Sequence, residues 1–153
     1  MVVSEKTIFR TIIDEGASTC IMSISCWKSI GSATLTESPN TLKAFDGRIF
    51  SPLGILKSLP IILEGKSVEV DMEVVDAPLD FNIILGRSWI YAMSMVVYSL
   101  FRVIKFPFQG KIVTIDQLAF FNVDSRVCKV PFVGKNPTNC DKIGVGLFKD
   151  SLL

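Results

Sequence analysis

The chain has 153 residues, a hydrophobic fraction of 49% and a formal net charge of +1, which together fit one globular domain with a packed core. Because no basic block is present, the sequence does not indicate nucleic-acid binding. The chain also contains no histidine, which excludes Ser-His-Asp catalysis, Cys-His catalysis and histidine-ligated zinc sites.

Cysteines and apolar segments bear on metal binding, compartment and membranes. None of the four cysteines belongs to a Cys-x-x-Cys pair, so we expect no metal site. The N-terminus lacks the continuous apolar stretch of a signal peptide, and no uncharged run reaches the length of about 20 residues that a membrane span needs. We therefore expect a cytoplasmic protein with reduced thiols, no cofactor, and neither a membrane nor a nucleic-acid partner.

The N-terminal part of the chain predicts short strands and one short helix. Residues 7–13 are rich in β-branched residues and end in a turn signal, and residues 2–3 would pair with them. Residues 23–30 place their large apolar side chains on one side of a short helix that a glycine ends. Residues 31–40 are rich in Ser, Thr, Pro and Asn and predict a surface loop.

The middle of the chain predicts two β-hairpins. Residues 41–45 and 48–50 flank Asp46-Gly47, which is a strong signal for a two-residue turn. Residues 55–63 and 67–75 flank a second turn, and the last of these strands alternates apolar and acidic residues. This alternation predicts one buried face and one face exposed to water, the latter carrying Glu69, Asp71 and Glu73.

The next segments predict further strands and a second helix. Residues 81–85 form a short apolar run that ends at Gly86, and residues 87–93 predict a short helix after it. Residues 95–106 and 111–115 predict two more strands. Many short strands with one or two brief helices indicate a mostly β domain with a closed or sandwiched architecture.

The domain boundary follows from a change in the pattern. Hydrophobic periodicity is lost from residue 122 onward, where Gly, Pro and Asn accumulate. We therefore assign residues 1–121 to one domain and residues 122–153 to a poorly ordered tail or linker.

Asp14 is the candidate catalytic residue. It ends the apolar strand Ile12-Ile13 and enters a turn that contains Gly16, so its carboxylate is held among backbone N–H groups. By itself an Asp-x-Gly run indicates only a turn. The chemistry is indicated by its combination with a later run, residues 83–87, in which an apolar stretch ends in Gly-Arg.

Four runs, in this order, resemble the protease domains of plant gypsy-type LTR retrotransposon polyproteins, which are retropepsin-like aspartic proteases. The family's Asp-x-Gly-Ala-Ser run is matched by residues 14–18, and its Leu-Lys-Ala-Phe-Asp-Gly run by residues 42–47. Its Val-Val-Asp-Ala-Pro-Leu-Asp run is matched by residues 74–80, and its Leu-Gly-Arg-x-Trp run by residues 85–89. The resemblance extends over residues 7–121.

The resemblance implies a retropepsin-like closed β-barrel and an aspartic endopeptidase that acts on extended polypeptides. Such enzymes need two carboxylates that share one proton, because like charges at close range cannot both ionise. This chain offers one suitable loop, on Asp14, so the resemblance implies a homodimer in which each copy supplies one aspartate.

The resemblance also assigns roles to other positions. The active-site loop continues from catalytic Asp14 through Glu15, Gly16, Ala17 and Ser18. Structural roles fall to Gly86, which would let the backbone approach closely behind Asp14, and to Arg87, which would form a structural ion pair. The flap, a hairpin that closes over the substrate, would carry Phe45, Asp46 and Gly47.

The sequence departs from the family at Glu15, where retropepsins carry Ser or Thr. A hydroxyl group donates and accepts hydrogen bonds, whereas an ionised glutamate only accepts them. Glu15 favours an alternative, in which a catalytically degenerate retropepsin-like fold serves as a dimerisation or peptide-binding module. Asp14, Gly16 and Gly86 favour the enzyme. A third hypothesis, a small β-barrel binding module unrelated to proteases, leaves the ordered runs unexplained.

Overall fold

The computed structural model describes residues 1–44, 46–77 and 79–116 and the backbone of residues 143–145. Two short helices are present in these ranges, α1 (Ile24–Ser29) and α2 (Arg87–Ala92). The strands are β1 (Val2–Val3), β2 (Lys6–Thr7), β3 (Thr11–Ile13), β4 (Cys20–Ser23), β5 (Leu42–Lys43), β6 (Ile49–Phe50), β7 (Gly54–Leu63), β8 (Lys66–Val75), β9 (Ile83–Leu85), β10 (Val96–Tyr98), β11 (Val103–Phe108), β12 (Lys111–Asp116) and β13 (Ile143–Val145).

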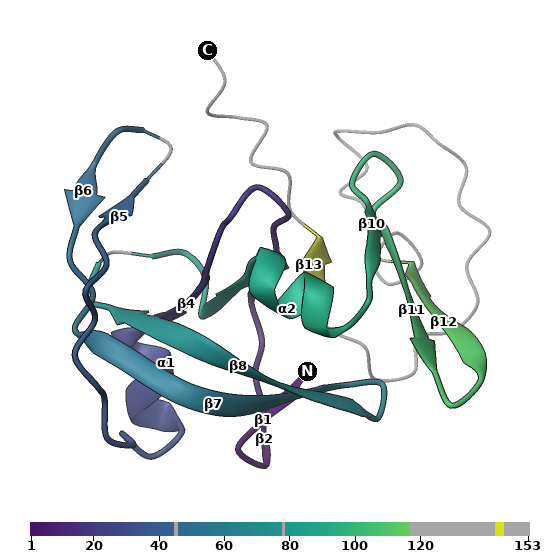
Figure 1. Ribbon diagram of the computed structural model, residues 1–153, viewed down its shortest axis with the longest axis horizontal. Coiled ribbons are helices and arrows are strands. Elements are labelled where there is room, and N and C mark those ends of the chain that lie inside the picture. The colour runs from purple at the N-terminus through teal and green to yellow at the C-terminus, as the bar shows by residue number, and fades with distance from the viewer. Residues whose placement is uncertain (45, 78, 117–142, 146–153) are drawn as a thin grey trace.

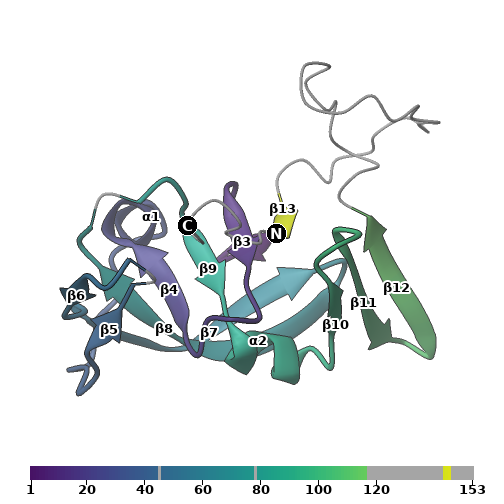
Figure 2. The same ribbon diagram turned by 90° about the horizontal axis from the view of Figure 1, so that it is seen from above.

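These elements form a mostly β fold, which confirms the predicted class (Figure 1). Eight strands make one curled sheet in the order β13-β3-β9-β4-β8-β7-β1-β2 (Figure 2). Strands β10, β11 and β12 make a three-stranded sheet, and β5 pairs with β6 alone. No helix in the described ranges has the length and apolar character needed to cross a membrane.

The β7–β8 hairpin is the largest element and confirms the second predicted hairpin. Its turn holds Glu64 at φ 46° and Gly65 at φ 83°, and positive φ at both central residues matches the right-handed twist of the two strands. Val70, Met72 and Val74 of β8 face the core, as the alternation predicts. One expectation is wrong, because Glu73 is buried rather than exposed to water.

The β5–β6 hairpin is also present, but its turn is longer than predicted. Leu42 pairs with Phe50 and Lys43 with Ile49, and the Ala44 N–H donates to the Arg48 carbonyl at 2.8 Å. A two-residue turn at Asp46-Gly47 is therefore wrong, since the loop runs from Ala44 to Arg48, and within it the Gly47 N–H donates to the Ala44 carbonyl at 3.0 Å. Each strand of this hairpin has only two residues. The hairpin lies at the left edge of the molecule in Figure 1.

Two predicted strands are interrupted by residues in the left-handed backbone region. Residues 7–13 were expected to form one strand, but Arg10 has φ 54° and separates β2 from β3. Residues 95–106 were likewise expected to be continuous, but a turn that ends at Arg102, with φ 53°, separates β10 from β11. The predicted pairing of residues 2–3 is confirmed, since β1 pairs with β2.

The three-stranded sheet packs against the tip of the β7–β8 hairpin and completes the core. The Lys66 ammonium, beside that tip, donates to the carbonyls of Met93 and Pro107, at 2.5 and 3.0 Å. Ile104 and Phe106 of β11 belong to the same buried cluster as β8 and α2. The helix α2 contributes Trp89 and Ile90 to this cluster, and its C-cap residue Met93 also belongs to it; Trp89 and Met93 are fully buried.

One strand lies in the segment that we assigned to a tail. β13 pairs in parallel with β3 and forms an edge of the eight-stranded sheet. The sequence predicts no strand there, because three residues are too few to show a period. Most of the predicted tail, and the five residues before it, lie outside the described residues, namely residues 117–142 and 146–153.

Candidate active site

The position of Asp14 follows from the order of three strands. β3 runs parallel to β9, and β4 runs antiparallel to β9 on its other side. The chain between β3 and β4 must therefore cross the end of β9, and Asp14 is the first residue of this crossing. The Asp14 N–H donates to the Leu85 carbonyl at 3.0 Å, so the aspartate is tied to the last residue of β9.

Gly86 follows β9 directly and lies against the crossing segment. A Cβ atom at Gly86 would lie 2.3 Å from the Thr19 carbonyl oxygen and 2.6 Å from that of Ala17. The backbone at Gly86 is extended, with φ −88° and ψ −166°, so glycine is required here by the lack of space. The Arg87 N–H donates to the Ala17 carbonyl at 2.9 Å and holds the two segments together.

Asp14 is a half-buried residue, and its carboxylate is oriented by its own loop. The Gly16 N–H donates to Asp14 Oδ1 at 2.8 Å, and the Ala17 N–H donates to the Asp14 carbonyl at 3.2 Å. These bonds hold the carboxylate at the turn and leave Oδ2 without a hydrogen bond from the described residues. A carboxylate in this position can accept a proton from a water molecule, which is the role of a general base.

Glu15 is exposed, and its partner was not predicted from the sequence. Its Oε1 atom accepts a hydrogen bond from the Ser99 hydroxyl at 3.1 Å. Ser99 lies in the turn between β10 and β11, together with Leu100 and Phe101, which are 75% and 62% exposed. No local sequence signal could have identified this contact, because it joins segments 84 residues apart.

The remaining predicted site residues lie in two places. Ser18 is exposed at the end of the Asp14 loop, and Arg87 is exposed on α2. No ion pair of Arg87 exists within the described part of the chain, so the expected structural ion pair is not seen there. Asp46 and Gly47 lie at the tip of the β5–β6 hairpin, and Phe45 lies outside the described residues.

The tip of the β5–β6 hairpin is held by local contacts. Asp46 Oδ1 accepts from the Arg48 backbone N–H at 3.0 Å, and Asp46 Oδ2 accepts from Arg48 Nε at 2.5 Å. The backbone hydrogen bond from Arg48, together with its side chain, lowers the pKa of Asp46 below the ordinary value of an aspartate. No hydrogen bond joins the described residues of this hairpin to those of the Asp14 loop.

Comparisons with known proteins agree with this geometry. No protein family and no curated protein matches the sequence. Among solved structures, the chain is similar to the retroviral protease-like domain of Ddi1 from Leishmania major, with a TM-score of 0.57 and 14% identity. The match covers 76% of this chain and 90% of that domain. The fold is retropepsin-like. The predicted fold is thereby confirmed.

In this retropepsin-like fold, a cavity of about 620 Å³ adjoins the Asp14 loop. Ser18 and Thr19 of the loop and Ser88 of α2 line one part of it. The other lining residues come from the loop of residues 37–40 and from β7 and β8. No sequence pattern predicts this cavity, because its walls come from five separate segments.

Proposed function

We propose that the chain is an aspartic endopeptidase that hydrolyses peptide bonds as a homodimer. The observation that carries the proposal is the way the backbone holds Asp14. The Asp14 loop crosses the end of β9, and Gly86 packs against this loop so closely that no side chain would fit. A half-buried carboxylate that is fixed by backbone hydrogen bonds, in a retropepsin-like fold, suits proton transfer to and from a bound substrate.

The proposed reaction uses the Asp14 carboxyls of two copies, which together hold one proton. The ionised carboxylate takes a proton from a water molecule, and the water oxygen attacks the carbonyl carbon of the peptide bond. The protonated carboxyl donates its proton to the carbonyl oxygen, which gives a neutral tetrahedral intermediate. Collapse of this intermediate breaks the C–N bond: the carboxyl that took the water proton passes it to the leaving nitrogen, and the other, now ionised, carboxylate takes a proton from one hydroxyl of the intermediate, which restores the shared proton.

The proposed dimer brings two Asp14 loops to a common two-fold axis. Two exposed apolar residues support contact with a second chain near this loop. Leu100 and Phe101 lie in the same turn as Ser99, whose hydroxyl contacts Glu15. Burying these side chains against their counterparts would remove apolar surface from water, which is the main driving force for association.

The biological setting of the proposal rests on the resemblance described above. We infer that the domain derives from a retrotransposon polyprotein, whose processing would be its reaction. A cytoplasmic location is consistent with the free thiols of Cys20 and Cys26, both of which are buried. Burial raises the pKa of the Cys26 thiol to about 11, so this cysteine is unreactive at neutral pH.

The proposal is tested by peptide cleavage at acidic pH with and without pepstatin, on the wild type and on Asp14→Asn. Asparagine keeps the Oδ1 acceptor for the Gly16 N–H, so the variant should fold normally and lose activity. Specific activity of the wild type should rise with protein concentration as dimers form. Activity that stays constant at concentrations where sedimentation detects only monomers would exclude the shared aspartate pair.

A second candidate function is favoured by one observation. Glu15 stands where a retropepsin has a hydroxyl residue, and its carboxylate is engaged by Ser99 of the same chain. A loop of this kind could serve a degenerate fold that dimerises or binds extended peptides without cleaving them. Peptide binding by the wild type, without cleavage at any pH, would favour this function over the endopeptidase.

A further inference from the structure

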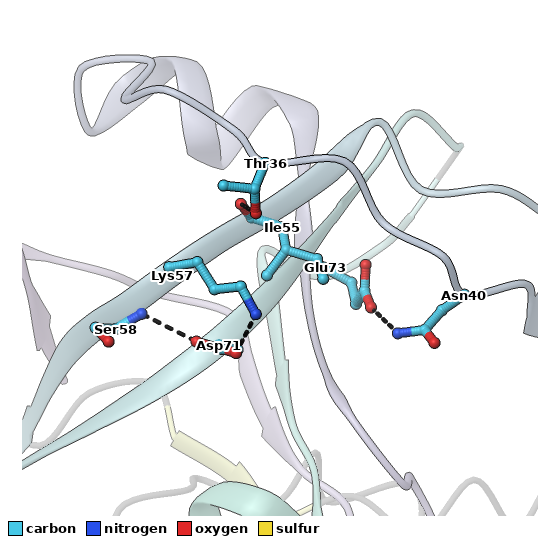
Figure 3. Close-up of polar contacts among 7 residues, drawn as sticks. All are labelled: Thr36, Asn40, Ile55, Lys57, Ser58, Asp71 and Glu73. Carbon is cyan, nitrogen blue, oxygen red and sulfur yellow. Dashed lines mark hydrogen bonds and ion pairs between the residues drawn. The ribbon is translucent and has the colours of Figure 1, made fainter.

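The cavity beside the Asp14 loop is lined by residues of β7 and β8, whose pairing contains a β-bulge. Figure 3 shows the polar contacts in this region. The pairing register shifts between Leu56 and Leu59, and Ser58 has φ 49°. The loop of residues 36–40 covers one side and is attached to β7 through Thr36, whose backbone N–H and carbonyl pair with those of Ile55 at 2.9 and 2.8 Å. The cavity is therefore bounded by the paired strands β7 and β8 and by a loop.

The charged residues that line this cavity are mainly acidic. Among the described residues that line the cavity, Lys57 is the one basic residue. Its ammonium forms an ion pair with Asp71 at 2.7 Å. Asp71 also accepts from the Ser58 N–H at 3.1 Å. Three lining carboxylates thus remain without an ion pair among the described residues, namely Glu37, Glu69 and Glu73.

The carboxylate of Glu73 is buried, and only one of its two oxygen atoms has a hydrogen-bond donor among the described residues. The residue is 2% exposed, and its Oε1 atom accepts from the Asn40 amide at 2.5 Å. Its Oε2 atom is buried and has no hydrogen-bond donor in the described structure. A buried carboxylate oxygen without a donor is energetically unfavourable, and a cationic group that enters the cavity would relieve this cost.

The lining residues favour an organic cation over a metal ion. Within the described residues, no group of three or more acidic, cysteine or histidine side chains is arranged to hold a metal. The cavity has apolar walls at Ile55 and Val70 as well as carboxylates. A long aliphatic stem with a charged end, as in lysine or arginine, would match both kinds of surface.

Building on the proposed endopeptidase, we propose that this cavity is a substrate subsite that selects a lysine or arginine side chain. The nitrogen donors would bind the Glu73 carboxylate, with the exposed Asn40 amide moving aside. From Asp14 to Ser18 the chain can extend at most about 14 Å, and an extended substrate advances by about 3.3 Å per residue. Ser18, where the cavity adjoins the loop, is therefore within the span of about four substrate residues from Asp14, and we expect the selected side chain at one of these positions.

The test uses pairs of peptides that differ only by lysine or norleucine at one position, for the four positions on each side of the cleaved bond. Binding is measured by fluorescence anisotropy on Asp14→Asn, which separates recognition from cleavage, and cleavage is measured on the wild type. At one position, the lysine peptide should bind about tenfold more tightly, since hydrogen bonds to charged groups contribute about 1.5–3 kcal/mol.

Two substitutions in the Asp14→Asn background then assign the preference to a residue. Glu73→Gln keeps an oxygen for Asn40 and removes the charge, so the preference should fall below about threefold. Glu5→Gln removes an exposed carboxylate from the β1–β2 turn, outside the cavity, and should keep the full preference. Thermal unfolding of both variants establishes that they are folded.

The outcomes separate the subsite from the endopeptidase. No preference for lysine at any position on the unaltered cavity would overturn the subsite, whether or not Glu73→Gln folds. Full preference retained in folded Glu73→Gln would overturn it as well. Cleavage without a lysine preference would reject the subsite and keep the endopeptidase. A lysine preference in binding, without cleavage by the wild type, would keep the subsite and reject the endopeptidase.

Discussion

Gly86 packs against the Asp14 loop, and Gly47 lies in the β5–β6 hairpin, but glycine is needed at these two positions for different reasons. At Gly86 the backbone is extended, and a side chain would collide with the carbonyls of Ala17 and Thr19. At Gly47 the backbone has φ 86°, and no atom of the described residues lies within 4 Å of the position that a Cβ would occupy. Gly86 is thus required by its neighbours, and Gly47 by its own backbone conformation.

This difference indicates how the two regions are stabilised. The Asp14 loop is fixed by hydrogen bonds to β9 and α2, which come from a distant part of the sequence. The β5–β6 hairpin is held by contacts between its own residues, among them Asp46 and Arg48. We therefore expect the loop to open only with the whole fold, and the hairpin to open locally at small cost.

The largest expected effect is that of Gly86→Ala. Its Cβ would lie far inside contact distance of two backbone oxygens, so β9 or the Asp14 loop must shift. We expect a loss of stability of about 3 kcal/mol or more, measured by denaturant unfolding. Gly110→Ala is the matched control, because Gly110 has φ 72° and open space around its Cβ position. It should lose about 1 kcal/mol. Equal losses for both variants would contradict the distinction.

Gly47→Val tests the other side of the comparison. A Cβ at Gly47 meets no atom of the described residues, so the expected cost is the strain of a positive φ, about 1 kcal/mol or somewhat more. If the hairpin closes over the substrate, peptide cleavage should fall by much more than this loss of stability predicts. Gly110→Val introduces similar strain away from the hairpin. A similar loss of activity in both variants would show that β5–β6 is only structural.

The parts of the fold that depend on local sequence were predicted well. Both hairpins were predicted from the turn signals at Asp46-Gly47 and Glu64 to Lys66, because a turn and its two strands are close in the chain, although the first turn is longer than two residues. The retropepsin-like fold was predicted from runs around Asp14 and Gly86, which lie together in the structure.

The features that sequence analysis missed depend on contacts between distant segments. Glu73 follows the alternation of an exposed face, but Asn40 and the loop before it cover this residue. Ser99 has no distinguishing sequence context, and only the folded chain places it beside Glu15. β13 is recognisable only by its pairing with β3. Such contacts leave no period or turn signal in the sequence.

A smaller effect is expected for Glu15→Thr, which sharpens the description of the Asp14 loop. In the proposed dimer, two glutamates and two aspartates would lie near one axis and repel one another at neutral pH. The threonine variant should dimerise about fivefold more tightly at neutral pH, and the difference should shrink in acid, where protonation removes the repulsion. Dissociation constants from sedimentation at both pH values provide the measurement.

Ser99→Ala is the control for the Glu15 variant. It removes the hydroxyl that donates to Glu15 but keeps all four carboxylates, so it should not strengthen the dimer. If Glu15→Thr and the wild type dimerise equally at neutral pH, Glu15 points away from the axis, toward Ser99 alone.

The smallest expected effect concerns pH and the tip of the β5–β6 hairpin. The pKa of Asp46 is lowered, first by the hydrogen bond from the Arg48 backbone N–H and also by the Arg48 side chain. A lowered pKa means that the folded hairpin favours the ionised form. The stability that ionised Asp46 gives the hairpin tip is therefore present at pH values above the ordinary pKa of about 3.9 and is lost as the pH falls through the pKa of the folded state.

NMR shifts of the Arg48 amide should follow this loss of stability, with a midpoint pH below that of a peptide of residues 43–49. Asp46→Asn should abolish the transition and leave the global unfolding temperature almost unchanged, because both side chains of the pair are largely exposed. A midpoint equal to that of the peptide would mean that the tip contacts do not form in solution, and the hairpin would then lack the local support that distinguishes it from the Asp14 loop.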